Sequence, residues 1–136
     1  MTKEELLAMP DSDYMNEKQL IFFKNLLIAE RERYCQGIAN LTKETMDAET
    51  LNTSAPDPID RQVGLEHLNR LTIENQRVNK LVNDINIALK KIEEGDYGYC
   101  EISGEPIGLK RLLTLPSAKY TTDEQERLEK QQKHFR

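Results

Sequence analysis

The chain has few of the residues that fill a large globular core. Its 136 residues include no tryptophan, and aromatic side chains make up only 6% of the sequence against 32% for charged ones. This composition favours long helices with a narrow apolar stripe over a wide hydrophobic interior. The length is that of one domain.

Other absences exclude whole classes of protein. The two cysteines, Cys35 and Cys100, are far apart in the sequence and do not suggest a disulfide framework. The net charge of -5 argues against general nucleic-acid binding, which needs a basic surface, so we expect no sequence-specific DNA binding. No apolar run approaches the length of a membrane span, and the N-terminus has no apolar signal core. We therefore expect a cytoplasmic protein without membrane contact.

One strong breaker divides two long predicted helices. The breaker is the run Asn52-Thr-Ser-Ala-Pro-Asp-Pro58, which is rich in turn-forming residues. The first predicted helix ends near residue 50, and the second runs from Pro58 to about Glu94. Two helices joined by a short turn pack antiparallel, so the sequence predicts a hairpin with its tip at residues 52–62.

The start of the first helix has its own signal. Asn16 offers an N-cap, and Gln19 stands three residues later, as a capping box requires. Before it, Pro10 and the neighbouring acids discourage regular structure. We therefore expect an irregular N-terminal tail at residues 1–15 and a hairpin at residues 16–94.

Both predicted helices carry an apolar stripe. In the first helix it consists of Leu20, Phe23, Leu27, Tyr34, Ile38 and Leu41, and in the second of Leu68, Leu71, Asn75, Val78, Val82, Ile85, Leu89 and Ile92. The steps in the second stripe alternate between three and four residues, which is the spacing of a coiled-coil seam. Asn75 is the only polar member, and a buried Asn can fix register at a cost in stability. The sequence therefore predicts a mainly α protein built on an antiparallel coiled-coil hairpin, roughly 50 Å long at the rise of an α-helix.

The segment after the hairpin has the spacing of a four-cysteine zinc finger without its ligands. The two C-x-x-C positions are occupied by Cys100 and Ser103, then by Thr121 and Glu124. Zinc in structural sites is held by four thiolates or imidazoles. One thiolate, two hydroxyls and a carboxylate make a poor site, so we expect neither a metal nor metal ligands here.

The missing metal has a predicted substitute. Thr121 and Glu124 also form an S/T-x-x-E capping box at the start of a predicted C-terminal helix, residues 122–136. The side chains expected to supply the remaining burial are Ile107, Leu109, Leu112, Leu115 and Tyr120. The alternative is a loosely folded unit at residues 95–121. Cys100 fits a small buried apolar role better than that of a redox-sensitive thiol.

These motifs together resemble one known family. Ile107, Arg111 and Pro116 stand between the two ligand pairs at the offsets of the zinc-finger signature of the DksA/TraR family of RNA polymerase-binding regulators. Three further stretches are similar to that family: Tyr14-Met-Asn-Glu17, Asp57-Pro-Ile-Asp60-Arg61 and Leu89-Lys-Lys-Ile…Gly98-Tyr-Cys100. The resemblance covers nearly the whole chain and is to the zinc-independent, cysteine-poor members of the family.

The resemblance implies a role for the hairpin tip. In DksA-like proteins the tip acids reach through the secondary channel of RNA polymerase toward its active centre. That role falls here on Asp57 and Asp60, with Arg61 beside them and Gln62 where the family pattern has Ala. The same two acids also suit a plain helix start, with Asp at the N-cap, Pro at N1 and an acid at N3, and this alternative remains open.

Two further sets of positions follow from the resemblance. Arg77 matches a basic position associated with polymerase docking, although an exposed helix Arg can equally be solvated. The family acts with the alarmone ppGpp, and a polyphosphate needs Lys or Arg. The matching positions are Asp84, Leu115 and Gln125, with Lys80 and Lys119 as weak substitutes. The sequence therefore argues against strong dependence on ppGpp.

The function predicted from these features is non-enzymatic. We expect a monomeric transcription regulator of the stringent-response type that binds RNA polymerase through its secondary channel and destabilises promoter complexes, for example at ribosomal RNA promoters. The alternative is a helical-hairpin adaptor that binds another protein through the same hairpin. A metal-dependent transcript-cleavage factor is least supported, because two acids that cap a helix are weak evidence for a catalytic metal.

Overall fold

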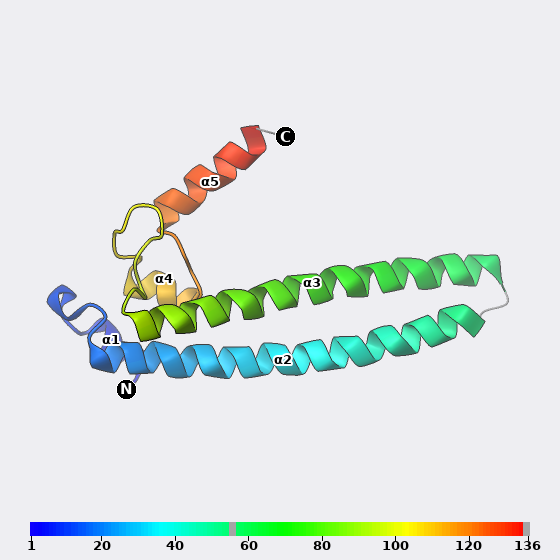
Figure 1. Ribbon diagram of the computed structural model, residues 1–136, viewed down its shortest axis with the longest axis horizontal. Coiled ribbons are helices and arrows are strands. Elements are labelled where there is room, and N and C mark those ends of the chain that lie inside the picture. The colour runs from blue at the N-terminus through cyan, green and yellow to red at the C-terminus, as the bar shows by residue number, and fades with distance from the viewer. Residues whose placement is uncertain (55–56, 135–136) are drawn as a thin grey trace. The chain divides into compact units, whose positions relative to one another are not determined.

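The computed structural model describes residues 1–54 and 57–134, and these are mainly helical (Figure 1). They form two compact units, Glu30–Asn83 and the combination of Met1–Ala29 with Asp84–Arg136, called the globular unit below. Two long helices, α2 (Glu17–Ser54) and α3 (Pro58–Glu94), contribute a stretch to each unit and run antiparallel, which confirms the predicted helical hairpin. Within the described residues no helix is both long and apolar enough to cross a membrane.

The bounds of the hairpin helices follow the sequence signals. Helix α3 begins at Pro58 and ends at Glu94, as predicted, and α2 continues beyond its predicted end near residue 50 to Ser54. Every member of both predicted stripes is buried or half-buried. In the globular unit Phe23 and Leu27 are fully buried, and the Phe23 ring lies 5.6 Å from that of Tyr97. Fully burying such a side chain contributes about 1.5–3 kcal/mol, so the buried members of the two stripes stabilise the hairpin.

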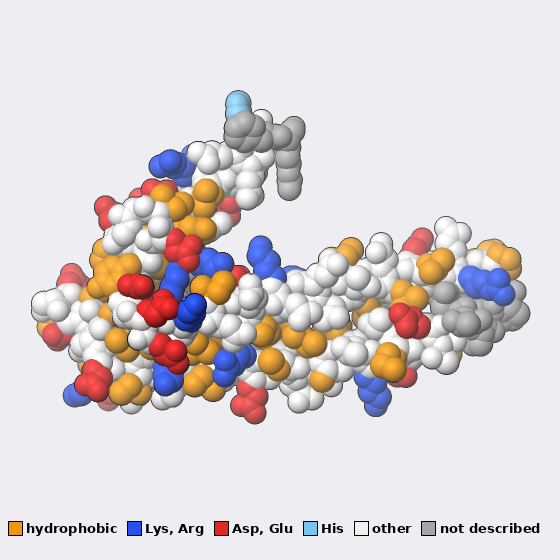
Figure 2. All heavy atoms as spheres, viewed as in Figure 1, with side chains coloured by type: hydrophobic (Ala, Val, Ile, Leu, Met, Phe, Trp, Pro, Cys, Tyr) orange, Lys and Arg blue, Asp and Glu red, His pale blue; other side chains and the backbone are white. Residues whose placement is uncertain are grey.

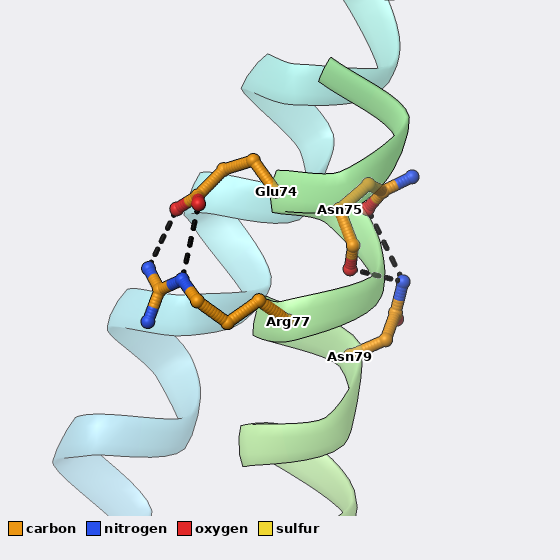
Figure 3. A network of polar contacts seen from close by, with 4 residues as sticks. All are labelled: Glu74, Asn75, Arg77 and Asn79. Carbon is orange, nitrogen blue, oxygen red and sulfur yellow. Dashed lines mark hydrogen bonds and ion pairs between the residues drawn. The ribbon is translucent and has the colours of Figure 1, made fainter. Parts of the chain in front are cut away.

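The polar residue of the α3 stripe bonds within its own helix. The Asn79 side-chain amide donates to the Asn75 carbonyl at 2.9 Å and to Asn75 Oδ1 at 3.2 Å (Figure 3). Asn75 is half-buried, as its stripe position requires. These two bonds satisfy its carbonyl and amide oxygens along α3.

The prediction of an irregular tail is wrong for the N-terminal segment. Helix α1 (Lys3–Leu7) begins with a complete capping box between Thr2 and Glu5, which satisfies backbone donors of its first turn. Leu6 is fully buried, and α1 contacts helix α4 (Leu109–Thr114). A short 3-10 turn, Asp11–Asp13, leads on to α2. The capping box at Thr2 and the burial of Leu6 favour a short helix here despite Pro10.

Tyr14 ties this N-terminal segment to the loops beyond the hairpin. Its hydroxyl donates to the Gly98 carbonyl at 2.6 Å and accepts from the Gly108 amide at 3.0 Å. Its ring packs edge-on against Tyr99, with centroids 5.7 Å apart. Burial raises the pKa of the Tyr14 hydroxyl, and the bond from Gly108 opposes that rise. One side chain thus closes contacts over more than eighty positions of sequence.

The predicted cap of α2 forms with a changed second arm. Asn16 Oδ1 accepts from the Gln19 amide at 2.9 Å, as expected, but Gln19 Oε1 accepts from the Met15 amide at 2.7 Å and not from Asn16. Met15 has a positive φ of 56°, and a Cβ at Gly98 would lie within 3.0 Å of its side chain. Position 98 therefore needs glycine, since its own φ is 92° and its neighbour leaves no room.

The rest of the globular unit is a compact turn followed by two short helices. The Cys100 amide donates to the Glu105 carbonyl at 2.8 Å, and the Tyr97 hydroxyl donates to the Pro116 carbonyl at 2.8 Å. Helix α4 buries Leu112 completely, and helix α5 (Thr122–His134) follows. The expected burial of Leu115 is wrong, because this residue is 41% exposed. It lies just past the end of α4, so the three-residue spacing from Leu112 no longer places it on the same face.

Removal of the Tyr14 hydroxyl tests the N-terminal attachment. Tyr14→Phe leaves the Gly108 amide without its partner and removes one of the two donors to the Gly98 carbonyl, the other being the Ile107 amide. We expect unfolding free energy to fall by about 1–3 kcal/mol. Urea unfolding followed by circular dichroism measures the change. Tyr99→Phe is the matched control, because the Tyr99 ring packs against the Tyr14 ring and this substitution removes a hydroxyl while keeping the ring. Equal stability of both variants and the wild type would contradict the bridging role.

Candidate functional site

The first candidate site is the start of α3 at the hairpin tip. Asp57 Oδ1 accepts from the Ile59 amide at 2.9 Å, and the Arg61 amide donates to the Asp57 carbonyl at 3.1 Å. These bonds confirm the predicted cap. Of the predicted tip, residues 55–56 and the side chains of residues 52–54 lie outside the described part of the structure.

The two tip acids, Asp57 and Asp60, have different structural roles. Asp57 caps the helix, whereas Asp60 lies in the first turn, where a negative charge favours the helix dipole by about 0.3–1 kcal/mol. Both are exposed, as is Gln62, and Ile59 between them is 71% exposed. The tip therefore presents two carboxylates and an aliphatic side chain on the surface, an arrangement suited to binding more than to catalysis.

The predicted docking residue already has a partner. Arg77 forms a two-pronged ion pair with Glu74 one turn earlier, with Nη2 at 2.6 Å from Oε1 and Nε at 3.0 Å from Oε2 (Figure 3). This hydrogen-bonded pair lowers the pKa of Glu74. An exposed pair of this kind is weak and exchanges easily. Arg77 can therefore leave Glu74 and pair with an acidic residue of a binding partner.

The second candidate site is the set of former ligand positions in the globular unit. Cys100 is 3% exposed, and the hydroxyl of Ser103 and the backbone of Ser103, Thr121 and Ile102 supply polar groups around its sulfur. Burial raises the pKa of this thiol, but hydrogen bonding to these groups outweighs burial and lowers it to about 7. The structure thus brings three of the four predicted positions to one sulfur atom.

The fourth position belongs to the start of α5. Thr121 Oγ1 accepts from the Glu124 amide at 3.3 Å, which confirms the predicted cap on the threonine side. The carboxylate of Glu124 lies with Oε2 3.7 Å from Arg127 Nη1. Glu124 is therefore an acid of the first helical turn paired with a base of the next.

The donor set does not fit zinc. A structural zinc takes four thiolate, imidazole or carboxylate ligands at about 2.0–2.3 Å. Here one thiolate is satisfied by hydrogen bonds, and the Thr121 hydroxyl accepts from a backbone amide. The described residues also contain no group of three or more His, Cys, Asp or Glu that could hold a metal ion.

The positions associated with a phosphate effector are occupied by other interactions. Lys119 Nζ lies 3.0 Å from Asp84 Oδ1, and its hydrogen bond to Asp84 raises the pKa of Lys119. Gln125 donates to Glu129 at 3.2 Å. Sequence reasoning named Asp84 and Lys119 separately and did not pair them, since their contact joins segments far apart in the chain. The charge of Lys119 is thus largely offset within the globular unit.

A second ion pair of the globular unit was also missed. Lys91 near the end of α3 bonds to Glu101 in the following turn. Lys91 belongs to the stretch Leu89-Lys-Lys-Ile, and Glu101 lies between the ligand positions Cys100 and Ser103, but no spacing rule pairs the two residues. Only the fold brings these opposite charges together.

The sequence of this chain is similar to those of known proteins. Residues 95–130 match the family model described as the prokaryotic dksA/traR C4-type zinc finger. RNA polymerase-binding transcription factor DksA of Caulobacter vibrioides is 36% identical over 98% of this chain and 92% of its own length. The protein of the same name from Escherichia coli K12 is 37% identical over 84% of this chain and 74% of its own.

A solved structure extends the likeness to three dimensions. Transcription factor DksA2 from Pseudomonas aeruginosa superposes with a TM-score of 0.83 at 37% identity, and the match covers 98% of this chain and 100% of that one. The similarity therefore includes the hairpin as well as the globular unit.

The hydrogen bonds to Cys100 predict a pH-dependent stability. A thiol with its pKa lowered from 9.0 to about 7 in the folded state stabilises the fold fully above pH 9 and loses that effect as pH falls through 7. We expect the unfolding free energy of the wild type, relative to Cys100→Ala, to rise by on the order of 1–2 kcal/mol between neutral and alkaline pH. Urea unfolding across that range measures it. The control Cys35→Ala, at an exposed position, should show no such rise. Parallel curves for wild type and Cys100→Ala would contradict an ionised, hydrogen-bonded sulfur.

Proposed function

This chain belongs to the DksA/TraR family, and from that membership we propose that it is a transcription regulator that binds RNA polymerase through the secondary channel. The observation that carries the proposal is the similarity to RNA polymerase-binding DksA proteins over the whole hairpin, together with the acids at the start of α3. Bound in this way it destabilises promoter complexes, for example at ribosomal RNA promoters. It does so without reading DNA sequence, in keeping with a net charge of -5.

The shape of the hairpin near its turn supports entry into a channel. Among the described residues of Glu30–Asn83, α2 and α3 are the only helices, and they lie side by side (Figure 1). Helices with side chains are about 10–12 Å across, so the pair measures roughly 10 by 20 Å in cross-section. The exposed carboxylates of Asp57 and Asp60 lie at the start of α3, at the tip end of the two helices. An acidic end on a narrow support can place charge where a globular domain does not fit.

Charge removal at the tip separates binding from regulation. Asp57→Asn keeps an N-cap acceptor, because Asn and Asp cap about equally well, and Asp60→Asn keeps its size. We expect both variants to fold and to bind core polymerase as the wild type does, and to lose inhibition of a ribosomal RNA promoter. The loss should be larger for Asp60→Asn, because the Asp57 side chain is also occupied by the Ile59 amide. Pull-down and in vitro transcription measure the two quantities.

Two controls accompany that experiment. Asp123→Asn removes an acid from the first turn of α5 and should leave regulation unchanged. An excess of a transcript-cleavage factor, which uses the same channel, should displace the wild-type chain. Full inhibition by the double tip variant would reduce the acids to helix caps. Binding that survives the competitor, or no binding at all, would favour the adaptor function.

We also propose that the fold is independent of zinc. Cys100 is the only thiolate among the four former ligand positions, and hydrogen bonds already satisfy it. The purified protein should contain no stoichiometric zinc by atomic emission, and a chelator should leave its thermal midpoint unchanged. A four-cysteine relative treated in parallel should lose stability, because metal binding contributes to folding directly. One tightly bound zinc per chain would refute the proposal.

Regulation by this chain is further proposed to depend little on ppGpp. The pairing of Lys119 with Asp84, and a leucine and a glutamine at positions 115 and 125, provide no free cationic cluster for a polyphosphate. Inhibition of a ribosomal RNA promoter should be the same with and without ppGpp once polymerase lacks its own ppGpp site. Strong synergy in that assay would show that other residues bind the effector.

A further inference from the structure

A groove of about 450 Å³ lies between α2 and α3 within Glu30–Asn83. Its floor is formed by Ala48 and Leu51 of α2 and by Val63 and Gly64 of α3. Leu51 is 71% exposed and Val63 is 57% exposed, so the floor keeps apolar surface in contact with water. Figure 2 shows hydrophobic, acidic and basic side chains interspersed on the visible face of the hairpin toward its turn.

The groove results from small residues at seam positions. On α2 its residues follow the steps 44, 47, 48 and 51, and on α3 the steps 60, 63, 64 and 67, which place each set on one helix face. Farther from the turn the facing positions carry larger residues, among them Leu68 and Leu71, and these are half-buried or buried. Ala48 and Gly64 are too small to fill the space between the helices in the same way. A hollow therefore replaces the packed seam.

The rim of the groove is acidic. Glu44 and Asp47 stand on the α2 side and Asp60 on the α3 side. His67 completes the rim, with its Nε2 3.9 Å from Glu44 Oε1. No Lys or Arg is among the described residues that line it. The groove thus combines an apolar floor with three carboxylates.

We propose that this groove receives a segment of RNA polymerase in which an aliphatic side chain is flanked by Lys or Arg. The proposal rests on the proposed function and names the chemistry of the surface that meets the hairpin. An aliphatic side chain would cover Leu51 and Val63, while flanking cations would meet the carboxylates of Glu44 and Asp47 on the α2 side. Electrostatic complementarity of this kind fixes register as well as partner.

Other occupants match the groove less well. A second copy of the chain would bring together two acidic surfaces of a protein with net charge -5. A phosphate or another anion is repelled by the same carboxylates. A bound metal ion is not favoured either, since no cluster of three or more potential ligands exists among the described residues.

Gly64 allows a test in which stability and binding change in opposite directions. Glycine inside a helix is destabilising, so Gly64→Leu should raise the thermal midpoint while it fills the groove. We expect its affinity for core polymerase to fall about tenfold or more, the worth of one buried aliphatic contact. The matched control is Gly37→Leu in α2 of the same unit, where a Cβ would meet nothing within 4 Å. It should gain stability and bind as the wild type does.

A charge variant and a crosslink identify the occupant. Glu44→Gln combined with Asp47→Asn should weaken polymerase binding and reduce its dependence on salt concentration. A photo-crosslinker at position 48 should attach to a polymerase peptide that has an aliphatic residue next to Lys or Arg. A peptide without a basic residue would overturn the stated chemistry.

The outcomes separate this inference from the proposed function. Equal affinity of wild type and Gly64→Leu for core polymerase overturns the groove assignment and leaves polymerase binding intact. Failure of the wild type to bind overturns both. A wild-type dimer in sedimentation that Gly64→Leu abolishes would assign the groove to a second copy and also overturn the inference.

Discussion

The polar groups around the buried Cys100 sulfur are the constraint on which the globular unit depends. They come from the turn at Ser103 and from Thr121, so they join two segments where a zinc finger of this family would use a metal. These groups favour the ionised sulfur, which accepts stronger hydrogen bonds than a neutral one. Because Thr121 also caps α5, a single residue connects the sulfur to the last helix.

The N-terminal segment completes this unit from outside the predicted finger. Leu6 fills a fully buried position, and Tyr14 bonds to the backbone of Gly98 and Gly108. The globular unit gains folding free energy from such contacts, each worth about a kilocalorie per mole. The finger and the N-terminus therefore stabilise one another.

How much could be predicted depended on whether a signal was local. Pro58 after an Asp cap and the three-four spacing of apolar residues fixed the hairpin, because both are set by neighbours along one helix. The capping box at Thr2 is equally local. Because that signal was overlooked, a segment that contains a short helix was predicted to be an irregular tail. The contacts of Tyr14 and the Lys119–Asp84 pair join distant segments, which no spacing rule reveals. The groove was missed for another reason: a search for apolar stripes passes over Ala48 and Gly64, whose small size creates it.

The central claim is that the globular unit provides stability while the start of α3 presents Asp57 and Asp60 to RNA polymerase. The structure of the complex tests this claim most directly. We propose cryo-electron microscopy of the chain bound to core RNA polymerase, with the transcript-cleavage factor left out. The account predicts Asp57 and Asp60 inside the secondary channel, with the Asp60 carboxylate directed at the active centre and the globular unit held at the channel entrance. A hairpin bound on the outer surface, with its tip in solvent, would contradict it.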